Sequence, residues 1–257
     1  MKTNNIKKVI IISICLTILA TVLTGCGDAK GNLTATVLPG NGNVMPIGGR
    51  IFYISEGDNG ATYTFYDQNM NVLENQTTDG LSAAYYYEKS GDSQSDKFFV
   101  YATKLGKPEG SIVSCKGLRW GSGSNRSQAN GTEIGTGKSN TEIVMGQFGA
   151  ECCIVMNRSY DTVWNWLKNE INDEEIGGLN GCMDWYIPSK IEMETLFKFK
   201  PTGLEEVKYW SSTEDNANAN RSYAYYFDAR KVSKGTFFWF SGGKDATEEC
   251  ALVIRSF

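Results

Sequence analysis

"DWYIPSKIEMETLF", residues 184 to 197, predicts a helix whose first residue is sharply defined. Pro188 ends the extended segment before it, because the proline ring fixes φ and removes a backbone donor. Ser189 and Glu192 have the Ser-x-x-Glu spacing of a capping box, in which each side chain bonds the backbone amide of the other residue. The positions that follow give this helix one apolar face: Met193, Leu196 and Phe197.

Large rings flank this helix in the sequence. Trp185 precedes it, and Trp210 follows it within "YWSST". We expect both rings to fill the core between helices and sheet, with their N–H groups bonded to acceptors. Near the C-terminus, Arg255 is expected to anchor the last strand through bidentate hydrogen bonds. These three residues, together with Pro188 and Ser189, are predicted to be structural.

Strand patterns lie at both ends of the chain, and helical patterns lie between them. The early strand patterns are "IGGRIFYISEG", "ATYTFYD", "FFVYATKL" and "SIVSCKGLRWG". The helical patterns follow Ser139, surround Val163 and follow Ser189. The late strand patterns are "YWSST", "SYAYYFDA", "GTFFWF" and "ALVIRSF". This order predicts one α+β domain over residues 46 to 257, with central helices, antiparallel strands at both ends and terminal strands side by side.

The stretch "GTEIGTGKSNTEI", residues 131 to 143, ends like a phosphate-binding P-loop. A P-loop needs a glycine five residues before its Gly-Lys pair, at the position of Thr132, but the glycine is Gly131. The spacing therefore does not fit a nucleotide site. Ser139 and Glu142 instead have the spacing of a second capping box, which predicts a helix that starts there.

The N-terminus has the features of a bacterial lipoprotein signal. A basic start precedes a charge-free apolar run, and "LTGC" matches the lipobox, with Cys26 as the lipid acceptor. We expect residues 1 to 25 to be removed and residues 26 to 45, rich in Gly and Asn, to form a lipidated tether. A single uncleaved membrane helix is the alternative, although the run is short for a span.

Charge and histidine content exclude several classes of function. Without residues 1 to 25 the chain has 22 basic and 29 acidic side chains, a formal charge of −7. A nucleic-acid binder would show the opposite balance, so no nucleic-acid partner is expected. The chain has no histidine, which excludes imidazole zinc sites and Ser-His-Asp or Cys-His catalysis.

The remaining cysteines are odd in number, so at most two disulfides can form and the pairing stays open. They are Cys115, Cys152, Cys153, Cys182 and Cys250. Asp67, Asn69 and Asn71 repeat the oxygen spacing of a calcium loop, but Val72 stands where that loop needs glycine. A polar turn fits better, and no metal or cofactor is expected.

Several blocks in their order resemble the C-terminal domain family of the collagen-like bacterial adhesins: "IGGRIFY", "GLRWG", "GTGKSNT", "DWYIPSKIEMETLF", "YWSST" and "ALVIRSF". The resemblance covers roughly residues 46 to 257. It implies a variant of the C-type lectin fold, similar in its core to formylglycine-generating enzymes and to the variable proteins of diversity-generating retroelements. Members are usually exported surface proteins, which agrees with the lipobox.

The resemblance does not carry enzyme activity to this chain. Formylglycine-generating enzymes imply a reactive cysteine pair near the end of the domain, where this chain has only Cys250. A glycosidase needs two opposed carboxylates, and among 29 acidic residues some pair will always fit. We therefore expect a protein without catalytic activity.

Residues 214 to 249 are the candidate ligand-binding segment, because they combine aromatic rings with amide side chains. In a C-type-lectin-like domain the corresponding part forms an exposed face, and such side chains suit recognition of sugars or proteins. Alternating aromatic residues can instead be one buried face of a sheet. The predicted ligand contacts are Asn216, Asn218, Asn220, Arg221, Tyr223, Tyr225, Lys231, Phe238 and Trp239.

The sequence therefore favours an exported, lipid-anchored surface protein that binds an extracellular glycan or protein. The first alternative is a retroelement-diversified receptor of the same fold, in which residues 214 to 249 vary between copies. The second alternative is a structural envelope lipoprotein with no specific ligand.

Overall fold

The computed structural model describes residues 36–37, 43–55, 61–74, 83–91, 97–106, 118–121, 126–148, 154–155, 158–159, 162–199, 201–215, 223–232, 237, 239–244 and 249–257. The signal segment and its lipobox residue Cys26 lie outside this range, as do Cys115, Cys152 and Cys153.

Mixed helices and antiparallel sheets make up the described chain, so the α+β prediction is confirmed at that level. One sheet has the order β1-β2-β5-β4, with bounds Thr36–Val37, Asn43–Pro46, Tyr86–Gly91 and Ala61–Tyr66. A second has the order β12-β6-β3, with bounds Ile254–Ser256, Lys97–Tyr101 and Arg50–Ser55. The early strand β3 and the last strand β12 thus share a sheet, but β6 lies between them.

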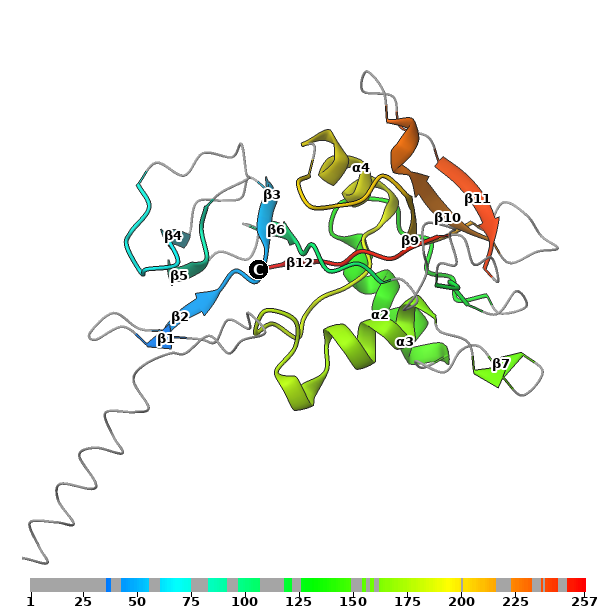
Figure 1. Ribbon diagram of the computed structural model, residues 1–257, viewed down its shortest axis with the longest axis horizontal. Helices are drawn as coiled ribbons and strands as arrows, with labels where there is room; N and C mark the ends of the chain where they lie inside the picture. Colours follow the sequence, from blue (N-terminus) through cyan, green and yellow to red (C-terminus); the bar gives the residue numbers. More distant parts are fainter. Residues whose placement is uncertain are drawn as a thin grey trace, which may run out of the picture.

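The third sheet, called the late sheet below, has the order β11-β10-β9. Its strands are Trp239–Gly243, Tyr223–Asp228 and Lys208–Asp215. It lies at the opposite side of the molecule from β1, β2, β4 and β5, and β12 runs between the two regions (Figure 1). The short strands β7 (Ile154–Val155) and β8 (Arg158–Ser159) form a separate pair.

Most of the described helices lie in the middle of the chain: α2 (Thr136–Phe148), α3 (Val163–Trp166), the π-helix η1 (Leu167–Ile171), the 3₁₀ helix η2 (Glu174–Ile176) and α4 (Lys190–Lys198). One further 3₁₀ helix, η3 (Ala229–Lys231), follows β10. The capping box of α4 is confirmed: Ser189 N donates to Glu192 Oε2 at 2.7 Å, and Glu192 N donates to Ser189 Oγ at 3.4 Å.

Helix α2 begins three residues before the predicted position. Ser139 lies inside the helix, where its hydroxyl donates to the Thr136 carbonyl at 2.9 Å. The amide of Gly135 donates instead to Glu192 Oε1 at 2.8 Å, so a carboxylate from another helix caps this end. A Cβ at Gly137 would lie 2.2 Å from Glu192 Oε2, and this glycine therefore serves close packing.

Four tryptophans are fully buried in the core: Trp120, Trp164, Trp185 and Trp210. Trp120 Nε1 donates to the Ser211 carbonyl, and Trp210 Nε1 donates to the Leu118 carbonyl, each at 2.8 Å. This reciprocal pair of bonds fixes residues 118 to 120 against β9. The indole of Trp185 donates to the Leu179 carbonyl at 2.9 Å.

A buried ion pair joins the two outer strands of the late sheet, β9 and β11. Lys244 follows β11, and its fully buried ammonium contacts Glu214 near the end of β9. Glu214 Oε2 also accepts from the amides of Ser127 and Gln128 and from the Ser127 hydroxyl, each at 2.8 Å. Burial raises the pKa of Glu214, but the bonds from Lys244 and Ser127 outweigh it and hold this pKa below its usual value.

We expect this pair to make folding sensitive to acid. The unfolded Glu214 binds a proton near pH 4.3, whereas the folded carboxylate stays ionised to lower pH, so its stabilisation is lost as pH falls through that window. Glu214→Gln should lower the free energy of unfolding at pH 7 by about 3–5 kcal/mol, because the buried ammonium of Lys244 loses the carboxylate that it contacts. Melting curves from pH 7 to pH 3 should show the gap between wild type and variant closing in acid. A constant gap across that range would contradict this role.

Candidate functional site

One face of the late sheet gathers the candidate ligand contacts. In β10 the alternation of a strand places Tyr223, Tyr225 and Phe227 on one side. The register pairs Tyr225 with Ser241 and Phe227 with Trp239, so β11 adds its side chains to the same face. Helix α4 packs against this face through Phe197, whose ring centroid lies 4.6 Å from that of Phe227. We call Tyr223, Tyr225, Phe227, Trp239 and Ser241 the aromatic face.

A lysine from α4 lies over two of these rings. Lys190 Nζ is 4.7 Å from the ring centroid of Tyr225 and 5.5 Å from that of Trp239. The two rings meet edge to face, with centroids 6.5 Å apart. All three side chains are partly exposed. Within the described residues no ion pair joins Lys190 to a carboxylate, so its ammonium is held mainly by the ring faces.

An acidic side chain borders the rings. Asp215, at the end of β9, accepts from the Ser241 hydroxyl at 2.6 Å and from the Tyr225 hydroxyl at 3.2 Å. Burial raises the pKa of Tyr225, and the charge of Asp215 adds to this effect. Tyr225 therefore stays protonated at neutral pH and its hydroxyl remains a donor. Ser241 itself is exposed.

The Trp239 side chain is held by a hydrogen bond from its indole N–H and by packing of its ring. Its indole N–H donates to Glu194 of α4, and its ring packs 5.4 Å from the Phe227 centroid. The surface next to Lys190 thus combines ordered rings, a hydroxyl, a carboxylate and a cation. Rings held in this way offer contact area at a low cost in conformational entropy, and the polar groups around them can direct a ligand.

The structure brings together only part of the predicted set. Tyr223, Tyr225 and Trp239 belong to the aromatic face. Lys231 does not, because its ammonium lies 4.5 Å from the ring of Phe240, whose side chain alternates to the opposite face. Lys231 therefore lies apart from Trp239, and its role as a ligand contact stays a prediction. The other predicted contacts lie outside the described residues: Asn216, Asn218, Asn220, Arg221 and Phe238.

Four residues at this site were not predicted from the sequence: Lys190, Glu194, Asp215 and Ser241. Lys190 and Glu194 belong to the segment that was assigned to the scaffold, although their spacing of four places them on one side of α4. Asp215 and Ser241 meet only through the pairing of β9, β10 and β11. A register prediction could have found these two, but composition could not.

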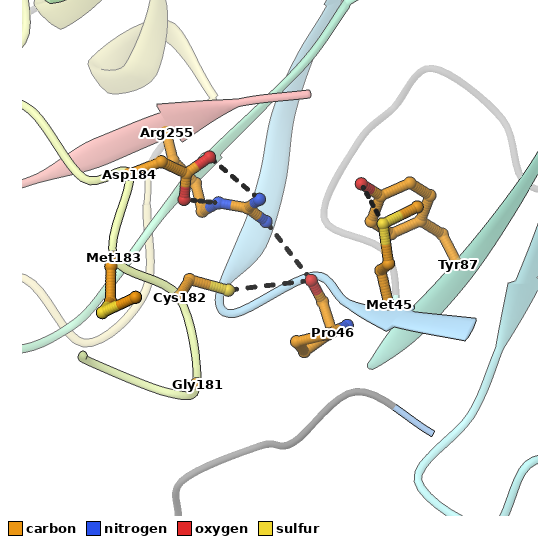
Figure 2. Close-up of a pocket in the computed structure, with 8 residues that line it drawn as sticks. All are labelled: Met45, Pro46, Tyr87, Gly181, Cys182, Met183, Asp184 and Arg255. Atoms are coloured by element: carbon orange, nitrogen blue, oxygen red, sulfur yellow. Dashed lines mark hydrogen bonds and ion pairs between the residues drawn. The ribbon is translucent and has the colours of Figure 1, made fainter. Parts of the chain in front are cut away.

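A separate hollow of about 380 Å³ lies beside Arg255 (Figure 2). Arg255 donates from Nε and Nη2 to the two oxygens of Asp184, at 2.7 and 3.1 Å. Its Nη1 donates to the carbonyls of Ile47 and Pro46, at 2.8 and 3.3 Å. The guanidinium therefore links the last strand to Asp184 and to the backbone at residues 46 and 47. Trp185, the next residue after Asp184, is fully buried.

Cys182 borders the same hollow but is not an activated nucleophile. Burial raises the pKa of its thiol to about 11, so the thiolate is scarce at neutral pH. The side chain donates weakly to the Pro46 carbonyl at 3.7 Å. Met183 and Asp184 separate this hollow from a second one, also about 380 Å³, between α2 and η1. These hollows show no array of groups for covalent chemistry.

The described residues provide neither a metal-binding cluster nor a membrane-spanning helix. They hold no group of three or more Cys, Asp or Glu side chains placed to bind a metal ion. The oxygen-rich stretch at Asp67 forms a turn, in which Asp67 Oδ1 accepts from the amides of Asn69 and Asn71 at 2.8 and 2.9 Å. None of the described helices is both long and apolar enough to cross a membrane.

We expect Arg255 to stabilise the domain through its geometry and not through charge alone. Arg255→Lys keeps the charge but cannot make the bidentate contact and both carbonyl bonds, so the free energy of unfolding should fall by about 1–3 kcal/mol. Asp184→Asn is the matched control: Asp184 is partly exposed and the carbonyl bonds remain, so its loss should be smaller. Urea denaturation of both variants would test this, and a larger loss for Asp184→Asn would contradict it.

The aromatic face comes from two strands, β10 and β11, and Asp215 of β9 and Lys190 and Glu194 of α4 border it. Comparison of the chain with protein-family models, curated proteins and solved structures finds no match.

Proposed function

We propose that this chain is a lipid-anchored surface protein whose domain binds an extracellular glycan or protein without catalysing a reaction. The observation that carries the proposal is the cluster of Lys190, Tyr225 and Trp239 beside Asp215 and Ser241. Its rings are partly exposed, whereas most of the large rings with described burial lie in the core. Partly exposed rings held by ordered polar neighbours are a common composition of recognition surfaces.

Charge and hydrogen bonding support a binding role for this cluster. Asp215 and Glu194 already accept bonds from the rings' polar groups, which fixes the positions of the rings. The Lys190 ammonium has donors to spare in the described structure, and the exposed Ser241 can also bond a ligand. The cluster thus offers a rigid apolar surface with polar groups at its border, which suits a sugar or a protein loop.

We further propose a C-type-lectin-like fold for residues 46 to 257, on a tether formed by residues 26 to 45. Support comes from the order of the sequence blocks and from the early strand β3 and last strand β12 in one sheet. The retroelement-diversified receptor is the second candidate. It is favoured by the Asn-rich residues 216 to 222, which in the sequence follow Asp215 and precede Tyr223.

The binding proposal predicts that truncation of one aromatic ring weakens ligand binding while the domain stays folded. Cells that express the full chain, or its Tyr225→Ala and Trp239→Ala variants, would be applied to arrays of glycans and extracellular-matrix proteins. Truncation of a central aromatic contact costs about 2 kcal/mol or more, so the apparent affinity should fall roughly 30-fold.

Phe240→Ala is the matched control, because it removes a partly exposed ring from the same strand on the opposite face. Binding that survives both Tyr225→Ala and Trp239→Ala would reject the site. An absence of saturable binding on every array would instead favour the structural lipoprotein.

The anchor predicts a change of location after a single substitution. Cys26→Ser removes the lipid acceptor, so the chain should leave the detergent phase and lose labelling by an alkyne fatty acid. Cys15→Ser, in the expected signal segment, is the matched control and should keep both properties. Equal labelling of the two variants would reject Cys26 as the acceptor.

A further inference from the structure

The two edges of the late sheet differ in how their backbone groups are satisfied. Along the outer edge of β9, Trp210 N donates to the Cys250 carbonyl at 2.9 Å and Ser212 N donates to the Pro188 carbonyl at 2.8 Å. Glu214 N donates to the Ala129 carbonyl at 2.7 Å. Loops of the chain therefore cover this edge.

The outer edge of β11 has no such cover in the described part of the chain. Its backbone groups bond to β10, and no described residue pairs with its other side. Proteins usually protect such an edge with a lysine, a proline or a bulge. The five residues of β11, "WFSGG", contain no lysine and no proline, and their pairing with β10 has no bulge. This edge is open to another strand.

The sequence of β11 is complementary to itself in the antiparallel direction. If two copies pair about Ser241, Trp239 of one copy lies opposite Gly243 of the other, and Phe240 lies opposite Gly242. Each bulky ring then faces a residue without a side chain, and Ser241 faces Ser241 at the two-fold axis. Side chains directly opposite each other in antiparallel strands are close enough to pack, so this register sets a ring against a glycine on either side of the Ser241 pair.

Gly242 has a second reason to be glycine within one copy. A Cβ there would lie 3.1 Å from Tyr226 Cε1 and 3.3 Å from the Trp210 ring. Gly242 therefore does not by itself indicate pairing, whereas Gly243 opposite Trp239 and the open edge do.

We propose that two copies of this chain associate through antiparallel pairing of their β11 strands, centred on Ser241. The two late sheets then form one continuous sheet, with three strands from each copy. Because the two-fold axis is perpendicular to the sheet, both aromatic faces point to the same side. A dimer of this kind presents two candidate binding sites in parallel, which raises avidity for a repeated ligand.

The size of the contact sets the expected strength. Pairing of two five-residue strands buries less area than the roughly 1,200 Å² of a stable specific interface. The association should therefore be weak between dilute soluble copies. Copies held on one membrane surface by a lipid meet at a much higher effective concentration, which favours the dimer. The full chain in its membrane is accordingly the form to test.

Ser241→Cys tests the register directly. Residues directly opposite in antiparallel strands have Cβ atoms roughly 4.5–5.5 Å apart, within reach of a disulfide after small adjustments. Mild oxidation of membranes that contain the full-length variant should shift the chain from the monomer band to a dimer band on a non-reducing gel, and reducing agent should reverse the shift. Val72→Cys is the matched control, because Val72 is exposed but lies in another part of the fold.

Ser241→Lys tests the same contact without a new thiol. Two ammonium groups would face each other across the two-fold axis, so chemical cross-linking of the membrane-bound chain should lose its dimer product while the melting temperature stays near that of wild type. Disulfide formation by Ser241→Cys no greater than by Val72→Cys or wild type would overturn the proposal. So would an unchanged cross-linked dimer in Ser241→Lys. Neither result depends on a ligand, so both are separate from the array experiment.

Discussion

The buried carboxylate of Glu192 is the contact on which the candidate site depends. It accepts from Ser189 N at the start of α4 and from Gly135 N at the start of α2, at 2.7 and 2.8 Å. One side chain therefore caps two helices that are far apart in the sequence. Burial raises the pKa of Glu192, and the amide bonds oppose this effect. Because the first residue of α4 is fixed here, the positions of Lys190 and Glu194 above the late sheet are fixed too.

A second buried contact, between Glu214 and Lys244, stabilises the late sheet itself. Their buried pair joins the ends of β9 and β11, and the loop at Ser127 is tied to the same carboxylate. A polar contact in such a place costs desolvation, so its value lies in defining one arrangement of strands. That arrangement sets the register in which Tyr225 meets Ser241 and Asp215. The candidate site is thus positioned by two buried acids that are not themselves part of the aromatic face.

Local patterns in the sequence predicted the features that depend on local physics. The cap at Ser189 and the helix after it follow from residues within one turn, and they are confirmed. The start of α2 was predicted wrongly because Glu192, some fifty residues later, supplies the cap that Ser139 was expected to supply. Lys231 is separated from Trp239 because η3 follows β10 and carries it toward Phe240. Such pairings depend on register and on helix placement, which composition does not encode.

The partial exposure of Tyr225 and Trp239 follows from where α4 begins. Phe227 is fully buried because Phe197, in the last turn of α4, covers it. Tyr225 and Trp239 instead lie beside the first residue of α4, whose Lys190 side chain reaches over both rings. Pro188 disfavours a helix start before residue 188, because its ring constrains the backbone of Ile187. The two ends of α4 therefore cover the aromatic face unequally: Phe197 packs on Phe227, whereas Tyr225 and Trp239 beside Lys190 stay partly exposed.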